Sequence, residues 1–97
     1  MASRSDLAEG DVLGVEAGGR QIAVYDCDGT LYATDNICTH AQARLCDGWL
    51  DGEAIECPLH AARFDVRTGK VLALPATADL KIYPVRIVEG GIEVEIP

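Results

Sequence analysis

Four tight-turn signals divide the chain and set the class of fold that it can adopt. Glycine pairs or Asp-Gly steps occur at Gly18-Gly19, Asp28-Gly29, Asp51-Gly52 and Gly90-Gly91. The favoured two-residue hairpin turns need positive φ angles, which glycine, asparagine and aspartate adopt most readily. Each signal lies between segments rich in Val, Ile, Leu and Tyr, so the pattern predicts a series of β-hairpins.

Hydrophobic residues alternate with polar ones around these turns. At the C-terminal end, Ile92, Val94 and Ile96 alternate with Glu93 and Glu95, which is the period of a half-buried strand. Similar strands are predicted at residues 11–16, 20–26, 30–34, 53–56, 71–74 and 81–89. Helical turns are expected at most at residues 45–50 or 76–80, and neither segment is long enough for a stable helix by itself. The sequence therefore predicts an all-β fold, either a small sandwich or an open barrel.

The length and composition predict one globular domain, residues 1–97. The chain has 97 residues, of which 48% are hydrophobic and 25% charged, a balance typical of folded proteins. A chain of this length forms one core and leaves no room for a separate catalytic domain.

The charge and the hydropathy pattern restrict the partners and the compartment. Asp and Glu total 16 against 8 Lys and Arg, giving a formal net charge of -8. Such a surface repels nucleic acid and anionic membranes, so basic protein surfaces are the better partners. No run approaches the roughly 20 apolar residues of a membrane span, and the N-terminal stretch lacks the apolar core of a signal peptide. We expect a cytoplasmic protein.

Two short motifs combine cysteine with histidine. They are Cys38-Thr39-His40 and Cys57-Pro58-Leu59-His60, and they contain both of the 2 histidines in the chain. The first motif lies in a segment, residues 36–49, where strand signals are weak, and such long loops are usually functional. Two loops that each offer a thiolate and an imidazole can bind one 2Fe-2S cluster. Histidine in place of cysteine on one iron defines the Rieske type of cluster.

A structural zinc site is the first alternative for Cys38, His40, Cys57 and His60, since two Cys and two His also satisfy tetrahedral zinc. Common zinc spacings pair Cys with Cys and His with His, whereas these motifs interleave them. The colour and the metal content of the purified protein distinguish the two sites.

A cluster bound by cysteines alone is the second alternative. It would use Cys27, Cys38, Cys46 and Cys57, but such clusters need closely spaced cysteines, and these intervals are long and regular. We therefore expect neither Cys27 nor Cys46 to be a ligand, although a small role near the cluster stays open for Cys46.

The two motifs together resemble those of the small Rieske ferredoxins of bacterial aromatic-ring-hydroxylating dioxygenase systems. The wider runs around them, at residues 32–40, 55–60, 63–65 and 74–76, are similar to the naphthalene-dioxygenase type. The resemblance extends over nearly the whole chain from Leu7 onward.

This resemblance implies a fold, a cofactor and its ligands. It implies a Rieske fold, in which an antiparallel β-sandwich base carries an inserted cluster-binding subdomain at about residues 35–76. It also implies one Rieske-type 2Fe-2S cluster. The thiolates of Cys38 and Cys57 would bind one iron and the imidazoles of His40 and His60 the other, with a loop at Pro75 covering the cluster.

The resemblance also implies an electron carrier rather than an enzyme. The chain would pass single electrons from an NAD(P)H-dependent ferredoxin reductase to the terminal oxygenase of an aromatic-ring-hydroxylating dioxygenase system, acting as a monomer. No Ser/His/Asp set, glycine-rich phosphate loop or Rossmann fingerprint is evident in the sequence. The alternative is a Rieske subunit bound permanently within another oxidoreductase complex.

Three residues near the ligand motifs predict a low reduction potential. High-potential Rieske proteins have an extra cysteine in each ligand loop, forming a disulfide, and the matching residues here are Ala43 and Leu59. Those proteins also have a serine hydroxyl that donates to a cluster sulfur, where this chain has Ala62. The potential should lie toward the lower end of the range for Rieske centres, roughly -150 to +300 mV.

Two further expectations concern the sheets. Related ferredoxins begin with an additional strand, and because this chain starts only a few residues before Leu7, we expect the base to lack that edge strand. The aromatic residues are expected in the core or half-buried on the sheets; they are Tyr25, Tyr32, Trp49, Phe64 and Tyr83.

Overall fold

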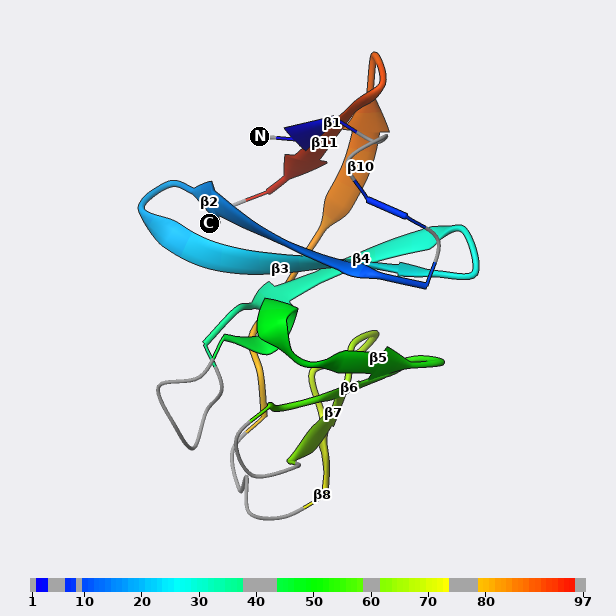
Figure 1. The fold of residues 1–97 in the computed structure, drawn as a ribbon. Coiled ribbons are helices and arrows are strands. Elements are labelled where there is room, and N and C mark those ends of the chain that lie inside the picture. The colour runs from blue at the N-terminus through cyan, green and yellow to red at the C-terminus, as the bar shows by residue number, and fades with distance from the viewer. Residues whose placement is uncertain are drawn as a thin grey trace.

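The computed structural model (Figure 1) describes residues 2–3, 7–8, 10–37, 44–58, 62–73 and 79–95. Within these ranges the regular structure consists of β-strands and the short 3-10 helix η2 (Leu45–Asp47). The predicted all-β fold is therefore confirmed, and the helical turn expected within residues 45–50 is present.

The strands form three antiparallel sheets. The first has the order β1 (Ala2–Ser3), β11 (Gly91–Val94), β10 (Val85–Val88). The second has the order β2 (Val12–Ala17), β3 (Arg20–Cys27), β4 (Thr30–Asp35), β9 (Ile82–Tyr83). The third has the order β5 (Trp49–Asp51), β6 (Ala54–Glu56), β7 (Arg63–Asp65), β8 (Val71–Ala73). The third sheet lies in the chain between β4 and β9, which pair with each other.

Tight turns join the neighbouring strands where the sequence predicts hairpins. Asp28 and Gly29 connect β3 to β4 with φ angles of 55° and 89°, as the favoured hairpin turns require. The third and fourth turns are shifted by one residue, because Asp51 ends β5 and Gly91 begins β11.

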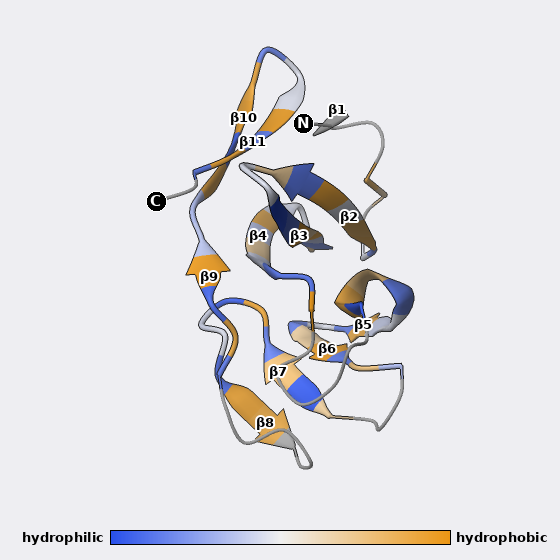
Figure 2. Cartoon of the chain, turned by 90° about the vertical axis from the view of Figure 1, so that its left-hand side faces the viewer, coloured by the Kyte–Doolittle hydropathy of each residue, from blue (hydrophilic) through white to orange (hydrophobic). Residues whose placement is uncertain are grey.

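The second sheet is the middle layer of the molecule (Figures 1 and 2). Residues alternate between the two faces of a strand, and both faces of β3 are buried. Ile22 and Val24 lie in one apolar core with Ile92 and Val94 of the first sheet. The other face packs against the third sheet in a second core, whose members include Ala23, Tyr25, Leu45, Ile55 and Phe64.

Three expectations about the strands need correction. An N-terminal edge strand is present, since β1 pairs with β11 through Ala2 opposite Ile92. The strand expected at residues 81–89 is divided into β9 and β10 by Pro84, which has no N–H for a sheet hydrogen bond. The short strands β5 and β7 were not predicted; β5 overlaps the segment where a helical turn was expected, and β7 follows the second Cys-His motif.

Among the aromatic residues, Trp49 is the exception to the expected burial. Tyr25 and Phe64 are fully buried, Tyr83 is buried and Tyr32 is half-buried. Trp49, in contrast, is 60% exposed. It begins β5, an edge strand of its sheet, and occupies a solvent-facing position next to the partly buried Leu50.

Replacement of Ile22 by alanine should destabilise the fold, because the side chain is fully buried in the middle layer. We expect the free energy of unfolding to fall by about 2 to 5 kcal/mol. The matched control is Ile87→Ala, whose side chain is 49% exposed and should cost less than about 1 kcal/mol. Urea unfolding followed by circular dichroism measures both, and equal losses would contradict the burial described above.

Candidate metal centre

The base of the first ligand loop is closed by backbone contacts on either side of residues 38–43. Ile37 and Arg44 form an isolated antiparallel bridge. Next to it, the N–H of Leu45 donates to the carbonyl oxygen of Asn36 at 2.6 Å. Two of the predicted ligands, Cys38 and His40, belong to the segment between these contacts and lie outside the described residues.

The second ligand loop leaves the end of β6. Cys57 follows this strand directly, is fully buried, and donates its N–H to the carbonyl oxygen of Ala62 at 2.8 Å. Ala62, also fully buried, precedes β7. The hydrogen bond thus closes the segment that contains His60, which lies outside the described residues together with Leu59.

The two loop bases touch each other at Gly48. This residue ends helix η2, and a Cβ atom added to it would collide with the carbonyl oxygen of Glu56. The same Cβ would lie 3.2 Å from Cδ of Pro58. The end of the first loop therefore packs against the start of the second, with no space for a side chain between them.

This close packing of the two loop bases is compatible with one metal cluster bound by residues of both loops. Cys57 is a free cysteine, buried next to the junction of the loops, and its thiol is a suitable donor for iron. Among the described residues, no group of three or more His, Cys, Asp or Glu can hold a metal ion. Of the four predicted ligands only Cys57 belongs to this described part.

The other two described cysteines lie in different surroundings. Cys27 ends β3 and is buried, and this burial, followed by the nearby carboxylates of Glu53, Asp26 and Asp65, raises the pKa of its thiol to about 11. Cys46 lies in helix η2, and its Sγ accepts a hydrogen bond from Nδ2 of Asn36 at 3.2 Å. That neither is a ligand stays a prediction.

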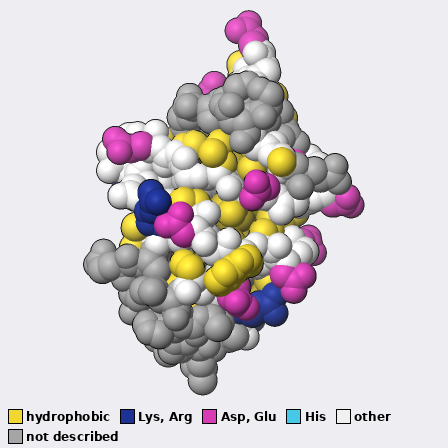
Figure 3. Space-filling model, viewed as in Figure 1, with side chains coloured by type: hydrophobic (Ala, Val, Ile, Leu, Met, Phe, Trp, Pro, Cys, Tyr) yellow, Lys and Arg dark blue, Asp and Glu magenta, His cyan; other side chains and the backbone are white. Residues whose placement is uncertain are grey.

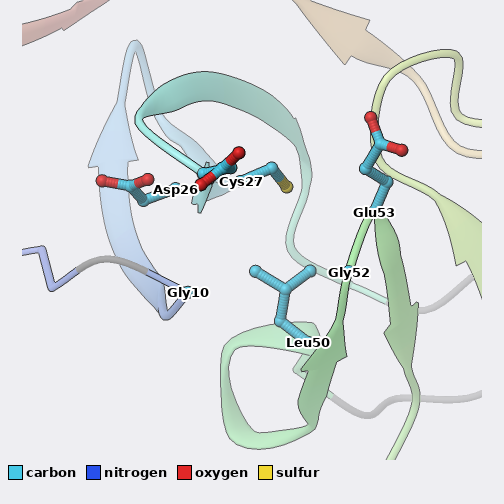
Figure 4. Close-up of a pocket in the computed structure, with 7 residues that line it drawn as sticks. Gly10, Asp26, Cys27, Leu50, Gly52 and Glu53 are labelled. Atoms are coloured by element: carbon cyan, nitrogen blue, oxygen red, sulfur yellow. The ribbon is translucent and has the colours of Figure 1, made fainter.

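A cavity of about 590 Å³ lies next to Cys27 (Figure 4). Its lining comes from the end of β3 and the turn after it, from β5 and the turn after it, and from Gly10. The thiol of Cys27 points toward the side where Leu50 and Glu53 lie. Burial first, and then the lining carboxylates of Glu53 and Asp26, raise the pKa of Cys27 and so suppress the thiolate, which is the form that binds metal.

Sequence reasoning missed two residues that shape the ligand loops, Asn36 and Gly48. Asn36 is 2% exposed, and Gly48 is needed for the close approach to Glu56. The sequence offered a weak signal for each. Asn36 lies two residues before the Cys-x-His motif, and Gly48 lies within the segment, residues 45–50, where a helical turn was expected.

Comparison with known proteins shows to which family this chain belongs. The family model of the Rieske [2Fe-2S] domain matches residues 1–84. A curated relative, the ferredoxin component of the naphthalene 1,2-dioxygenase/salicylate 5-hydroxylase systems of Ralstonia sp., is 57% identical over 86 residues, which cover 89% of this chain and 83% of the relative.

Solved structures give the same result. The ferredoxin of Sphingomonas yanoikuyae B1 has a TM-score of 0.93 and 38% identity, covering 100% of this chain and 96% of that one. A chain in the complex of reduced oxygenase and oxidized ferredoxin in carbazole 1,9a-dioxygenase has a TM-score of 0.90 and 38% identity, covering 98% of both chains.

The chain belongs to the Rieske [2Fe-2S] domain family. Within that family its curated relatives are ferredoxin components of dioxygenase systems. The predicted family, fold and cluster type are thereby confirmed. In the part of the chain that the structure describes, no helix is both long and apolar enough to cross a membrane.

Gly48→Ala tests the contact between the two loop bases. The added Cβ would collide with the backbone of Glu56, so we expect a loss of about 1 to 3 kcal/mol of stability and a lower iron content after purification. Gly52→Asn is the control, since Gly52 has open space around it and asparagine tolerates its positive φ angle. Unchanged iron content and stability in Gly48→Ala would show that the loops do not depend on this contact.

Proposed function

We propose that this chain is the ferredoxin component of an aromatic-ring-hydroxylating dioxygenase system. It carries single electrons from an NAD(P)H-dependent ferredoxin reductase to the terminal oxygenase and is not itself the catalyst. The observation that carries this proposal is the 57% identity to a ferredoxin component over most of both chains. The likeness to a chain in a solved oxygenase–ferredoxin complex supports the oxygenase as a partner.

The proposed ligands are Cys38 and Cys57 for one iron and His40 and His60 for the other, within a cluster-binding subdomain at about residues 35–76 of a single domain, residues 1–97. A bound Rieske cluster supplies reversible one-electron chemistry. The described residues support this set, because the base of the loop containing Cys38 and His40 packs against the segment leading to Cys57. Pro75, proposed to cover the cluster, lies outside the described residues.

The proposed carrier acts in the cytoplasm, and its net charge of -8 favours basic surfaces on its partner proteins. Most described arginines already have acidic partners on this chain. The pairs are Arg44–Asp47, Arg63–Asp51, Arg67–Asp65 and Arg86–Glu93. Figure 3 shows dark-blue cationic groups beside acidic ones, with further acidic side chains spread around the outline. The net charge of -8 would attract a basic surface on the reductase or oxygenase.

The experiment for the function is reconstitution of electron transfer with a ferredoxin reductase and candidate terminal oxygenases. We expect a small amount of this protein to support many turnovers of the oxygenase, as a monomeric carrier does. A stable complex on gel filtration, with no turnover after dilution of the chain, would instead favour the permanently bound subunit. Colourless protein that contains zinc and no iron would contradict both functions.

Matched cysteine variants test the ligand set. Cys57→Ser should remove iron and visible absorption from the purified protein, because a hydroxyl is a poor substitute for thiolate. Cys27→Ser, at another buried position, should retain both. Cys38→Ser, His40→Asn and His60→Asn should behave like Cys57→Ser. Full iron content in any of these four variants would remove that residue from the ligand set.

Ala62→Ser tests the proposed low potential. Ala62 is buried directly after the second loop, and its carbonyl oxygen accepts the N–H of Cys57. A serine hydroxyl that donates to a cluster sulfur stabilises the reduced state by about 1 kcal/mol, or roughly 40 mV for one electron. Voltammetry should show this increase, with Ala17→Ser in the base as the control. An unchanged potential would show that Ala62 does not lower it.

A further inference from the structure

We infer that Asn36 is a positioning residue for the ligands of the first loop, holding both ends of that loop in one arrangement and thereby setting the reduction potential. This inference rests on the proposed function, since it concerns the cluster that this function requires. It assigns a role to a side chain that is neither a ligand nor adjacent in sequence to one.

The side chain of Asn36 bonds to the far end of the loop. Its Oδ1 accepts the backbone N–H of Cys46 at 2.8 Å, and its Nδ2 donates to Sγ of the same residue at 3.2 Å. Asparagine side chains in loops usually bond to a backbone group within a few residues. Here the partner is ten positions away, so these bonds bridge residues 38–43 instead of forming a local turn.

The backbone of Asn36 is hydrogen-bonded to the middle sheet and to helix η2. Its N–H donates to the carbonyl oxygen of Gln21 on β3 at 3.0 Å, while its carbonyl oxygen accepts the N–H of Leu45. The residue is therefore bonded on one side to the middle sheet and on the other side to helix η2. At 2% exposure these bonds are shielded from water, which makes their loss costly.

Gly14 on β2 leaves room for this pair. A Cβ atom added to Gly14 would lie 2.8 Å from Sγ of Cys46 and 3.2 Å from Nδ2 of Asn36. The Asn36–Cys46 pair thus packs closely against Gly14 of the base. This arrangement also gives Cys46 a defined role, as the hydrogen-bond partner of Asn36.

Replacing a positioning residue alters different measured properties from replacing a residue that only stabilises the fold. The orientation of the residues that bind a metal depends on the contacts around them, and such contacts tune the metal's properties. If Asn36 only stabilises the fold, its loss lowers stability and leaves the potential of the remaining folded protein unchanged. If it positions the loop, the potential and the electron paramagnetic resonance spectrum of the reduced protein change as well.

The experiment compares Asn36→Leu, Gly14→Ala and Cys46→Ala with the wild-type holoprotein. Asn36→Leu removes both side-chain bonds at similar volume. We expect its reduction equilibrium constant to change by about threefold or more, roughly 30 mV for one electron, with altered resonance g values. Cys46→Ala keeps the bond between Oδ1 and the backbone N–H, so its shift should be smaller. Gly14→Ala crowds the pair from β2 and should shift the potential even if Asn36→Leu fails to fold.

Ile22→Ala is the stability control, because it weakens the base through the apolar core shared with the first sheet, which does not include Asn36. Its potential and spectrum should equal those of the wild type. Wild-type values in folded Asn36→Leu, or in Gly14→Ala where Asn36→Leu does not fold, would overturn the positioning role. Failure of the proposed function is distinguishable, since wild-type protein would then lack iron or would not transfer electrons.

Discussion

Burial of β3 on both faces is the constraint on which the molecule depends. The register of a strand is specified where one of its faces is buried, and β3 has side chains in two cores at once. Ile22 and Val24 enter the core beneath the first sheet, while Ala23 and Tyr25 enter the core shared with the third sheet. A slip of one residue would exchange these two sets. The hydroxyl of Tyr25 forms a hydrogen bond of 2.9 Å with the hydroxyl of Thr34 on β4. This bond allows the polar group to be buried in the second core.

The base of the proposed metal centre is held by a series of contacts that starts at this middle layer. Asn36 follows β4 directly and is bonded to β3, and helix η2 packs in the core that includes Tyr25. Gly48 then brings the end of that helix against Glu56, at the start of the second loop. The described bases of the two loops are therefore linked to each other, and to β3, by backbone contacts. Charged side chains on the surface contribute little to this geometry, because exposed ion pairs are weak.

Features that depend on residues close together in the sequence were predicted correctly. Glycine and Asp-Gly steps predicted the hairpins, and alternation at residues 92–95 predicted which face of β11 is buried, since Ile92 and Val94 are buried and Glu93 and Glu95 are exposed. The spacing of cysteine and histidine indicated the cofactor class. Prediction failed where a property depends on residues distant in sequence. The exposure of Trp49 follows from the edge position of β5, and the roles of Asn36 and Gly48 follow from contacts across loops.

The exposed indole of Trp49 determines which changes in this protein its intrinsic fluorescence can report. Trp49 is the single tryptophan of the chain. In the folded state 60% of its surface is already exposed to water. Its fluorescence maximum will therefore be close to that of a fully solvated indole, and unfolding will shift it little. Coverage of the same ring by another protein removes water from it and shifts the emission to shorter wavelength. Intrinsic fluorescence is thus poorly suited to follow denaturation of this chain and better suited to follow contacts made by the edge of its third sheet.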